Sequence, residues 1–463
     1  MERHGDILLT RRAFLHAATV AGLTVGVSLL AACTRSVSTS TPTEFPRATA
    51  IPIPATPTLP PTVAQATATV TPITTSHVAA AYLQDALDYI AQNSIMRDRV
   101  DWQQLRDDAM TLTQDAQTTA DTYPAIRFAV QQLNDHHSSF FTPDQWRTLQ
   151  WASASGLGLI NKGRVIVAVY PSSPASQAGM QVRDVIIAVN GTPVESLPAS
   201  QLSALAYTRT GGATLTLQRA GEASPITVTL TVADFDMYRP PQGRALTADI
   251  GYLELPAFSG TPERGVRYAT TVQQAIRGAD VSPMRGWIVD LRLNGGGNMY
   301  PMLAGVGPVL GAGEVGGFVD AHGNRTWFAY RDGVASLNGK ALGTVDIAPY
   351  TLQRPMPPVA VLTSEGTASS GEAIVVAFRG RPATRSFGAS TAGVPTANTA
   401  KEVSDGASIN LTQAFDCDRT GQTYNASIPP DQAVTMDWSL LDTDCDPVIA
   451  AARDWLRNQP GFS

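Results

Sequence analysis

The chain has 463 residues, of which 43% are hydrophobic and 16% are charged, and its formal net charge is −6. This length and composition can bury a sizeable core and predict two or three domains. Lysine and arginine form no stripe along the chain. Because a surface that binds phosphate needs clustered basic residues, nucleic acid is excluded as an expected partner.

Residues 1–33 have the pattern of an export signal. Thr10-Arg-Arg-Ala-Phe-Leu15 matches a twin-arginine motif, and an apolar stretch follows it. Leu30-Ala-Ala-Cys33 then matches a bacterial lipobox, which predicts cleavage before Cys33 and attachment of lipid to it. The alternative, an uncleaved membrane helix, needs roughly 20 apolar residues, more than this stretch provides. We therefore expect an exported protein that Cys33 anchors to the outer face of the membrane or to the cell envelope.

Two segments of contrasting composition follow the signal. Residues 34–76 are rich in threonine, proline and alanine with almost no charge, which predicts a disordered linker. Residues 77–150 carry apolar residues at helical spacing and predict a helical N-terminal domain. Pro124 is placed to open the third helix of this domain, which ends at Leu133-Asn-Asp-His-His-Ser138.

Residues 155–233 are rich in β-strand patterns. Apolar runs such as 164–170 and 184–191 alternate with turn residues, and the segment begins with Gly-Leu-Gly-Leu. It resembles a PDZ domain. The resemblance implies that a loop of backbone amides binds the terminal carboxylate of a peptide, while the peptide adds as a strand to the sheet edge. The residues of this loop would be Gly156, Leu157, Gly158 and Leu159. The alternative is a β-rich packing module that binds nothing.

Apolar strands alternate with helical stretches over residues 245–458, which predicts an α/β core with parallel strand pairing. We expect strands at 250–255, 286–291 and 358–362, helices at 262–277 and 446–456, and irregular glycine-rich chain at 311–349. The predicted fold class is therefore α/β, in a multi-domain (α+β) chain with a helical segment, a PDZ-like β domain and an α/β core.

A serine-rich motif follows the third of these strands, Thr363-Ser-Glu-Gly-Thr-Ala-Ser-Ser-Gly-Glu372. The next residues, 373–378, can continue as a helix. A serine at a strand-to-helix turn lies beside unpaired backbone amides and the positive end of the helix dipole. This environment suits a nucleophile whose reaction builds an oxyanion. The alternative is a Ser/Gly-rich loop in which a serine caps the helix.

Two further motifs accompany the serine-rich one. Asp290-Leu-Arg-Leu-Asn-Gly-Gly-Gly297 ends a strand in three glycines, and Leu133-Asn-Asp-His-His-Ser138 supplies histidine. Together with Gly366-Thr-Ala-Ser-Ser-Gly-Glu372, they resemble the motifs of the tail-specific, or C-terminal-processing, serine proteases, in the branch that includes the tricorn core and interphotoreceptor retinoid-binding protein. The resemblance covers residues 78–458 and implies a protease core of the crotonase/ClpP-like type.

The resemblance assigns roles to individual residues. Ser369 matches the attacking serine of the family, with Ser370 as its rival within the motif. The family pattern Leu-x-Asp-x-His selects His137 as the general base, a role that imidazole suits because it titrates near neutral pH. A serine–lysine dyad is disfavoured, because the nearest downstream lysine, Lys401, does not fit the family spacing. The oxyanion donors would be the backbone amides of Gly296 and Ser370.

The third catalytic position departs from the tricorn-like pattern. Relatives of that branch carry a glutamate shortly before a Pro-Asp pair that matches Pro430-Asp431, and Asn425 stands in its place here. Asparagine can orient an imidazole but cannot stabilise the imidazolium by charge. Asn425 is therefore the candidate orienting residue, and the carboxylates of Asp416 and Asp418 are the alternatives.

Two cysteines remain once Cys33 is assigned to the lipid. In an exported protein the pair Cys417 and Cys445 favours a disulfide. The alternatives are two buried free thiols or a metal site, and two cysteines without a nearby histidine are poor zinc ligands. We expect no metal and no cofactor.

The sequence thus predicts an exported, membrane-anchored serine endopeptidase that hydrolyses peptide bonds of protein substrates through an acyl-enzyme. The PDZ-like domain would recognise substrate tails. One alternative is a catalytically weak or inactive protein that binds peptides or apolar ligands on the same fold. Another is a sensor that binds peptide tails through the PDZ-like loop while the core is inert. The expected partners are protein or peptide substrates and the lipid membrane.

Overall fold

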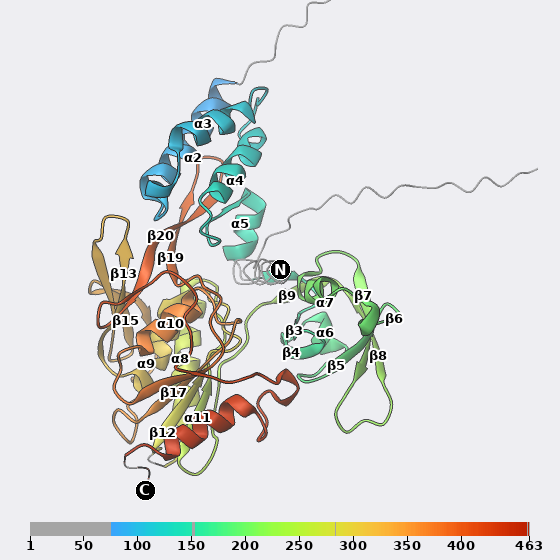
Figure 1. Ribbon diagram of the computed structural model, residues 1–463, viewed down its shortest axis with the longest axis vertical. Coiled ribbons are helices and arrows are strands. Elements are labelled where there is room, and N and C mark those ends of the chain that lie inside the picture. Colours follow the sequence, from blue (N-terminus) through green and yellow to red (C-terminus); the bar gives the residue numbers. More distant parts are fainter. Residues whose placement is uncertain (1–75, 151–152, 283, 461, 463) are drawn as a thin grey trace, which may run out of the picture. The chain divides into compact units, whose positions relative to one another are not determined.

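The computed structural model describes residues 76–150, 153–282, 284–460 and 462 (Figure 1). The predicted signal, its Cys33 and nearly all of the predicted linker lie outside these residues. Within them, no helix is both long enough and apolar enough to cross a membrane.

The N-terminal segment is helical. It consists of α2 (His77–Asn93), α3 (Trp102–Thr111), α4 (Tyr123–Gln132), β1 (Ser139–Phe141) and α5 (Pro143–Gln150). Ser76 and Asp101 cap α2 and α3, because each side chain accepts a hydrogen bond from a backbone amide of the first turn. The apolar faces of α2, α3 and α4 pack together and against one end of β20 (Ser408–Asp418), a strand from much later in the chain.

The predicted PDZ-like residues form a sheet of their own, with the strand order β3-β4-β5-β7-β8 and β6 beside β5. Its elements are β3 (Leu159–Lys162), β4 (Val165–Val169), α6 (Pro174–Gln177), β5 (Val185–Val189), β6 (Thr192–Pro193), α7 (Ala199–Ala204), β7 (Gly212–Gln218) and β8 (Ile226–Thr231). The chain enters and leaves this sheet through a strand pair, β2 (Ser153–Gly156) with β9 (Ala233–Asp236). Along β7 every second residue is buried, as expected for a strand with one face on a core.

The core sheet has the strand order β10-β11-β12-β17-β18-β22. Its strands are β10 (Gln242–Ala245), β11 (Ile250–Glu254), β12 (Gly286–Asp290), β17 (Val359–Thr363), β18 (Thr384–Gly388) and β22 (Gln432–Ala433). All neighbouring pairs from β11 to β22 are parallel, and only β10 is antiparallel. Every residue of β12 and β17 is buried, because helices cover both faces of the sheet.

Helices α8 (Pro262–Ala279), α9 (Met299–Leu310) and α10 (Ser370–Phe378) pack against one face of the core sheet (Figure 1). The closing helix α11 (Pro447–Arg457) packs against the other face. The glycine-rich motif follows β12 and the serine-rich motif follows β17, its parallel neighbour. Since parallel strands end at the same edge of a sheet, this topology brings the two motifs together.

A second sheet has the order β1-β20-β13-β14-β15-β16, with β19 and β21 also paired to β20. Its remaining strands are β13 (Gly313–Asp320), β14 (Arg325–Arg331), β15 (Val334–Leu337), β16 (Lys340–Thr344), β19 (Thr396–Glu402) and β21 (Thr423–Tyr424). The expectation of irregular chain at 311–349 is therefore wrong. Glycine is compatible with these strands because it makes room for aromatic rings: a Cβ on Gly316 would lie 2.4 Å from the ring of Phe328.

Candidate active site

Ser369 lies at the turn between β17 and α10, where it is the N-cap residue of the helix. Its backbone has φ 51° and ψ −120°, a conformation that costs energy for any residue with a Cβ. The backbone amide of Ser369 donates a hydrogen bond to Glu372 Oε2 at 2.9 Å. The turn is thus strained at the residue that the sequence predicts as nucleophile, and Glu372 holds it in place.

Glu372 is fully buried and accepts four hydrogen bonds. Besides the amide of Ser369, the donors are the Thr391 hydroxyl and the amides of Gly393 and Val394. Burial raises the pKa of Glu372 to about 7, and these hydrogen bonds oppose that rise. The carboxylate therefore joins the nucleophile turn to the loop that leads into β19.

His137 lies just after α4 and is 5% exposed. The carboxylate of Asp135 accepts hydrogen bonds from the amides of His137 and Ser138, which shapes the turn. The ring atom Nδ1 of His137 is 2.6 Å from Oγ1 of Thr396 on β19. Burial lowers the pKa of His137 to about 4, against the opposing charge of Asp135, so the imidazole is neutral at pH 7 and able to accept a proton.

Ser369 and His137 line one cavity of about 730 Å³. Thr396 of β19, Asp416 of β20 and Ala373 of α10 also line it. No hydrogen bond joins the Ser369 hydroxyl to the imidazole, whose Nδ1 is occupied by Thr396. The ring nitrogen left for the serine is Nε2. The structure thus brings the predicted nucleophile and base to the same cavity, in a geometry that must tighten for proton transfer.

Two backbone amides near Ser369 donate to no acceptor among the residues that the structure describes. The amide of Ser370 is the first of α10, and the amide of Gly297 is likewise unpaired. The amide of Gly296, predicted as an oxyanion donor, instead donates to Oδ1 of Asn294 at 3.0 Å, which corrects that prediction. Gly296 contributes close packing: a Cβ on it would lie 2.8 Å from the Cβ of Ser369.

The hydroxyl of Ser370, the rival nucleophile, donates to the carbonyl oxygen of Gly297 at 2.5 Å. This bond fastens the glycine loop to the start of α10. The Ser370 hydroxyl is therefore already engaged, whereas the Ser369 hydroxyl forms no hydrogen bond with the glycine loop.

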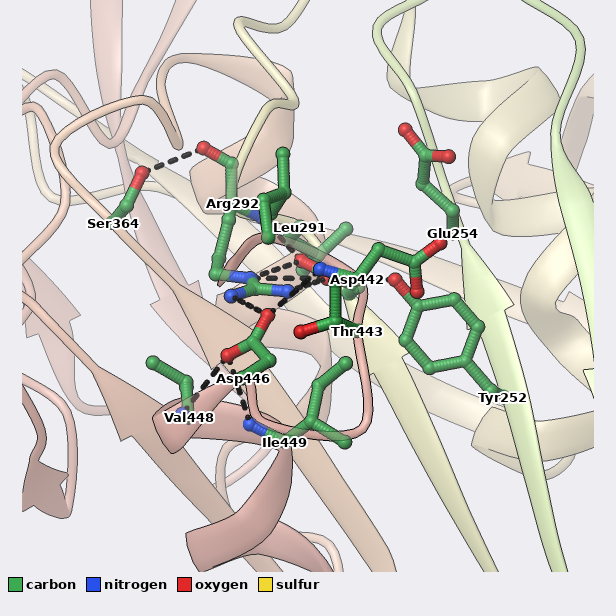
Figure 2. A network of polar contacts seen from close by, with 12 residues as sticks. Tyr252, Glu254, Leu291, Arg292, Ser364, Asp442, Thr443, Asp446, Val448 and Ile449 are labelled. Carbon is green, nitrogen blue, oxygen red and sulfur yellow. Dashed lines mark hydrogen bonds and ion pairs between the residues drawn. The ribbon is translucent and has the colours of Figure 1, made fainter. Parts of the chain in front are cut away.

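A buried ion cluster fixes the start of the glycine loop (Figure 2). Arg292 pairs with Asp290 at 2.6 Å and with Asp446 at 2.8 Å, and all three side chains are at most 6% exposed. Tyr252 donates its hydroxyl to Asp290, and the hydroxyl of Ser364 donates to the carbonyl oxygen of Arg292. The cluster therefore ties β12, the nucleophile turn and the beginning of α11 into one frame.

Asn425 does not orient the imidazole. It is exposed, just after β21, and it is absent from the lining of the cavity. The partner of the imidazole is Thr396, which no sequence motif marked. The sequence signals only that Thr396 follows closely on Thr391, Gly393 and Val394. The structure shows that these three residues contact Glu372 and so place Thr396 near the imidazole.

The disulfide prediction is also wrong, since Cys417 and Cys445 are both free thiols. Cys417 is buried within β20, whereas Cys445 is exposed in the turn before α11. An even number of cysteines in an exported chain makes a disulfide chemically possible. It does not show that the two residues lie within bonding distance in the fold.

The Gly-Leu-Gly-Leu loop joins β2 to β3. The side chains of Leu157 and Leu159 are buried, and Gly158 has φ 74°. The carbonyl of Gly158 accepts from the amide of Tyr170, whereas the amides of Leu157 and Gly158 donate no hydrogen bond within the described chain. A pair of free amides in such a loop has the geometry needed for a carboxylate.

Two segments of the chain match known protein families. The profile of "Peptidase family S41" matches residues 249–434, and that of "PDZ domain" matches residues 165–219. The first match covers strands β11 to β22 of the core sheet with the glycine-rich and serine-rich motifs, but not β10 or His137, and the second covers most of the separate β sheet. The predicted fold class is thereby confirmed.

Several curated proteins are similar to this chain. The nisin-resistance protein of Lactococcus lactis subsp. lactis is 31% identical over 180 residues, which are 39% of this chain and 54% of that protein. The chloroplastic C-terminal processing peptidase of Tetradesmus obliquus is 27% identical, with 71% of each chain covered. The carboxy-terminal processing protease CtpA of Bacillus subtilis is 28% identical over 63% of this chain and 58% of its own length. The chain thus spans little more than half of the first and last of these relatives.

Two solved structures share the fold. A lipoprotein from Streptococcus agalactiae superposes with a TM-score of 0.52 at 20% identity, covering 82% of this chain and 97% of that one. The photosystem II D1 C-terminal processing protease gives a TM-score of 0.53 at 23% identity, covering 81% and 98%.

Proposed function

We propose that the protein is an exported serine endopeptidase that cleaves protein substrates through an acyl-enzyme, because its core matches the profile of peptidase family S41 and the preceding segment matches that of a PDZ domain. The observation that carries this proposal is the cavity shared by Ser369, at the strained N-cap of α10, and the neutral imidazole of His137.

In the proposed reaction, Oγ of Ser369 attacks the carbonyl carbon of the scissile peptide bond while Nε2 of His137 takes its proton. The carbonyl oxygen becomes an oxyanion, which the amides of Ser370 and Gly297 stabilise. The C–N bond then breaks, and His137 gives the proton to the leaving amine. Water attacks the acyl-enzyme with His137 again as base, which releases the carboxylic acid and restores Ser369.

The PDZ domain would recognise substrate tails, with the free amides of Leu157 and Gly158 binding the terminal carboxylate within the loop Gly156–Leu159. The lipobox motif supports an anchor at Cys33, which would hold the enzyme at the outer face of the membrane or cell envelope. The similarity to a streptococcal lipoprotein is consistent with export.

The test compares full-length protein with its Ser369→Ala and Ser370→Ala variants, using an unfolded protein substrate and a serine-reactive phosphonate. We expect Ser369→Ala to lower the rate by about 10⁴-fold or more and to abolish labelling. In Ser370→Ala the phosphonate should still label Ser369. Equal cleavage by wild type and Ser369→Ala would contradict the serine mechanism.

A catalytically inactive binding protein is the second candidate, because no carboxylate contacts the imidazole of His137 within the described chain. In that case, the phosphonate should label neither serine, while peptides would still bind.

A further inference from the structure

We propose that Asp416 makes the catalytic cavity selective for a peptide with a lysine or arginine side chain beside the bond to be cut. The proposal rests on the peptidase function proposed above and adds the substrate class.

Asp416 is a buried carboxylate without a partner in the described part of the chain. Only 1% of the residue is exposed, and neither carboxylate oxygen forms a hydrogen bond with any of the described residues. It lies near the C-terminal end of β20, opposite Phe318 of β13 and Tyr424 of β21. Buried polar groups are nearly always paired, because leaving one unpaired costs free energy. An unpaired carboxylate on the wall of an active-site cavity therefore indicates a partner that arrives from outside.

Asp418, two residues further along β20, provides the contrast. Its oxygens accept hydrogen bonds from Thr420, Gln422 and Tyr424, so its charge is satisfied within the protein. The two aspartates of this strand thus differ in their hydrogen bonding. Asp418 stabilises a turn, whereas Asp416 accepts no hydrogen bond from the described residues.

The position of Asp416 links it to the reaction. Its backbone amide donates to the carbonyl of Pro395, and the next residue, Thr396, carries the hydroxyl that contacts His137. The cavity is also lined by Ala373 in the first turn of α10, the helix whose N-cap is the proposed nucleophile Ser369. A side chain that reaches Asp416 therefore belongs to a residue close to the scissile bond.

The lining of the cavity suits a cation better than an anion. Among the described residues, it includes the aspartates Asp320 and Asp416 and contains no lysine or arginine. Burial raises the pKa of Asp416, and the charge of Glu372 adds to the rise, so the surroundings within the protein favour the neutral form of the carboxyl group. An entering ammonium or guanidinium group would favour the ionised form, and the proton would leave as the ion pair forms.

An organic cation fits better than a metal ion. Within the described chain, no group of three or more histidine, cysteine, aspartate or glutamate side chains is arranged to hold a metal. A single unpaired carboxylate matches one lysine or arginine head group, and the aromatic side chain of Tyr300 lines the same cavity.

The experiment uses the full chain and a peptide series that is identical except for lysine, arginine, leucine or glutamate at the residue before the scissile bond, and a matched series varied after it. We expect kcat/KM to be roughly tenfold or more higher for lysine or arginine than for leucine in one series, and lowest for glutamate. Asp416→Asn should bring the lysine-to-leucine ratio close to one, whereas Glu314→Gln, which removes a charge from an exposed position on β13, should leave it unchanged.

Two outcomes would overturn the proposal. One is an unchanged lysine-to-leucine ratio in Asp416→Asn. The other is an equal loss for all peptides with an altered pH profile, which would make Asp416 a positioning residue for the imidazole. Asp416→Ala is the second variant, and thermal unfolding of both variants establishes that they are folded.

A binding measurement separates this proposal from the peptidase proposal. The affinity and enthalpy of binding of lysine and leucine peptides to Ser369→Ala, with and without Asp416→Asn, are measured by titration calorimetry. Two buffers of different ionisation enthalpy are used, because the difference in binding enthalpy between them gives the number of protons released. Tighter binding of the lysine peptide with proton release, lost in the double variant, supports the proposal even if wild type cleaves nothing. Cleavage by wild type with no basic preference in either measurement would sustain the peptidase and reject the role of Asp416.

Discussion

Two buried polar clusters lie near the same edge of the core sheet, and they are built in opposite ways. In the cluster around Arg292, Asp290 and Asp446, the opposite charges form ion pairs and Tyr252 completes the hydrogen bonding. In the proposed catalytic cavity, Asp416 has no partner among the described residues, and the amides of Ser370 and Gly297 have none either. The charges of the paired cluster are compensated by other residues of the protein. The groups of the unpaired cluster, under the proposals above, find their partners in a bound substrate.

The two clusters are physically joined, which is why the difference matters. The carbonyl of Arg292 accepts a hydrogen bond from Ser364, in the same loop as the proposed nucleophile Ser369. A strained residue such as Ser369 persists only where the surroundings hold it. The paired cluster supplies that support, so the unpaired one can keep its groups available for chemistry.

The largest effect on stability should come from breaking the paired cluster. We expect Arg292→Met to lower the free energy of unfolding by about 3–5 kcal/mol, because Asp290 and Asp446 would be left buried without a counter-charge. Denaturant unfolding of the full chain measures this. The control is Arg264→Met, which removes a partly exposed ion pair with Asp236 and should cost less than about 1 kcal/mol. Similar losses in both variants would show that the cluster is not a special support.

The sequence predicted much of the fold, because the features that decide it are local. Alternation of apolar strands with helical spacing gave the α/β core, and strand ends at Asp290 and Thr363 put the two motifs at one edge. The meander of β13 to β16 was missed. From the sequence alone, its glycines indicate irregular chain. In the structure they make room for side chains from other strands, as Gly316 does for the ring of Phe328, more than ten residues away.

The site was predictable only where a motif carried it. Ser369 and His137 line one cavity, although they are 232 positions apart in the chain. Thr396 and the free amide of Gly297 were not predicted, because their roles depend on which neighbour already has a hydrogen-bond partner. Asn425 and the disulfide failed for the same reason: sequence position does not determine which groups meet across β19, β20 and β21.

Asparagine substitutions in the two clusters should have opposite pH dependence. Burial alone would raise the pKa of Asp290, but Arg292 beside it holds that pKa below its usual value, so its stabilising effect is present at neutral pH and lost in acid. Asp290→Asn should therefore cost about 1–3 kcal/mol at pH 7 and less at pH 3. The pKa of Asp416 is raised by burial, so its contribution is fully present below about pH 4 and is lost as pH rises through the folded-state pKa.

Asp416→Asn should accordingly gain stability relative to wild type as the pH rises, while Asp290→Asn loses it. Unfolding of wild type and both variants between pH 3 and pH 8 measures the two trends. Parallel curves for the two variants would contradict the distinction between a paired and an unpaired carboxylate.

The smallest change should come from the contact that orients the base. Thr396→Val keeps the shape of the side chain but removes the hydroxyl 2.6 Å from Nδ1 of His137, and we expect kcat to fall about tenfold with little change in KM. The control is Thr399→Val, on the same cavity wall without a hydrogen bond to the imidazole. Because burial lowers the pKa of His137 to about 4, the acid limb of kcat/KM should lie near pH 4 in wild type and stay there in Thr396→Val. An acid limb near pH 6.5 would instead mean that the imidazole is hydrated in the working enzyme, and that the closed cavity is not the state in which proton transfer begins.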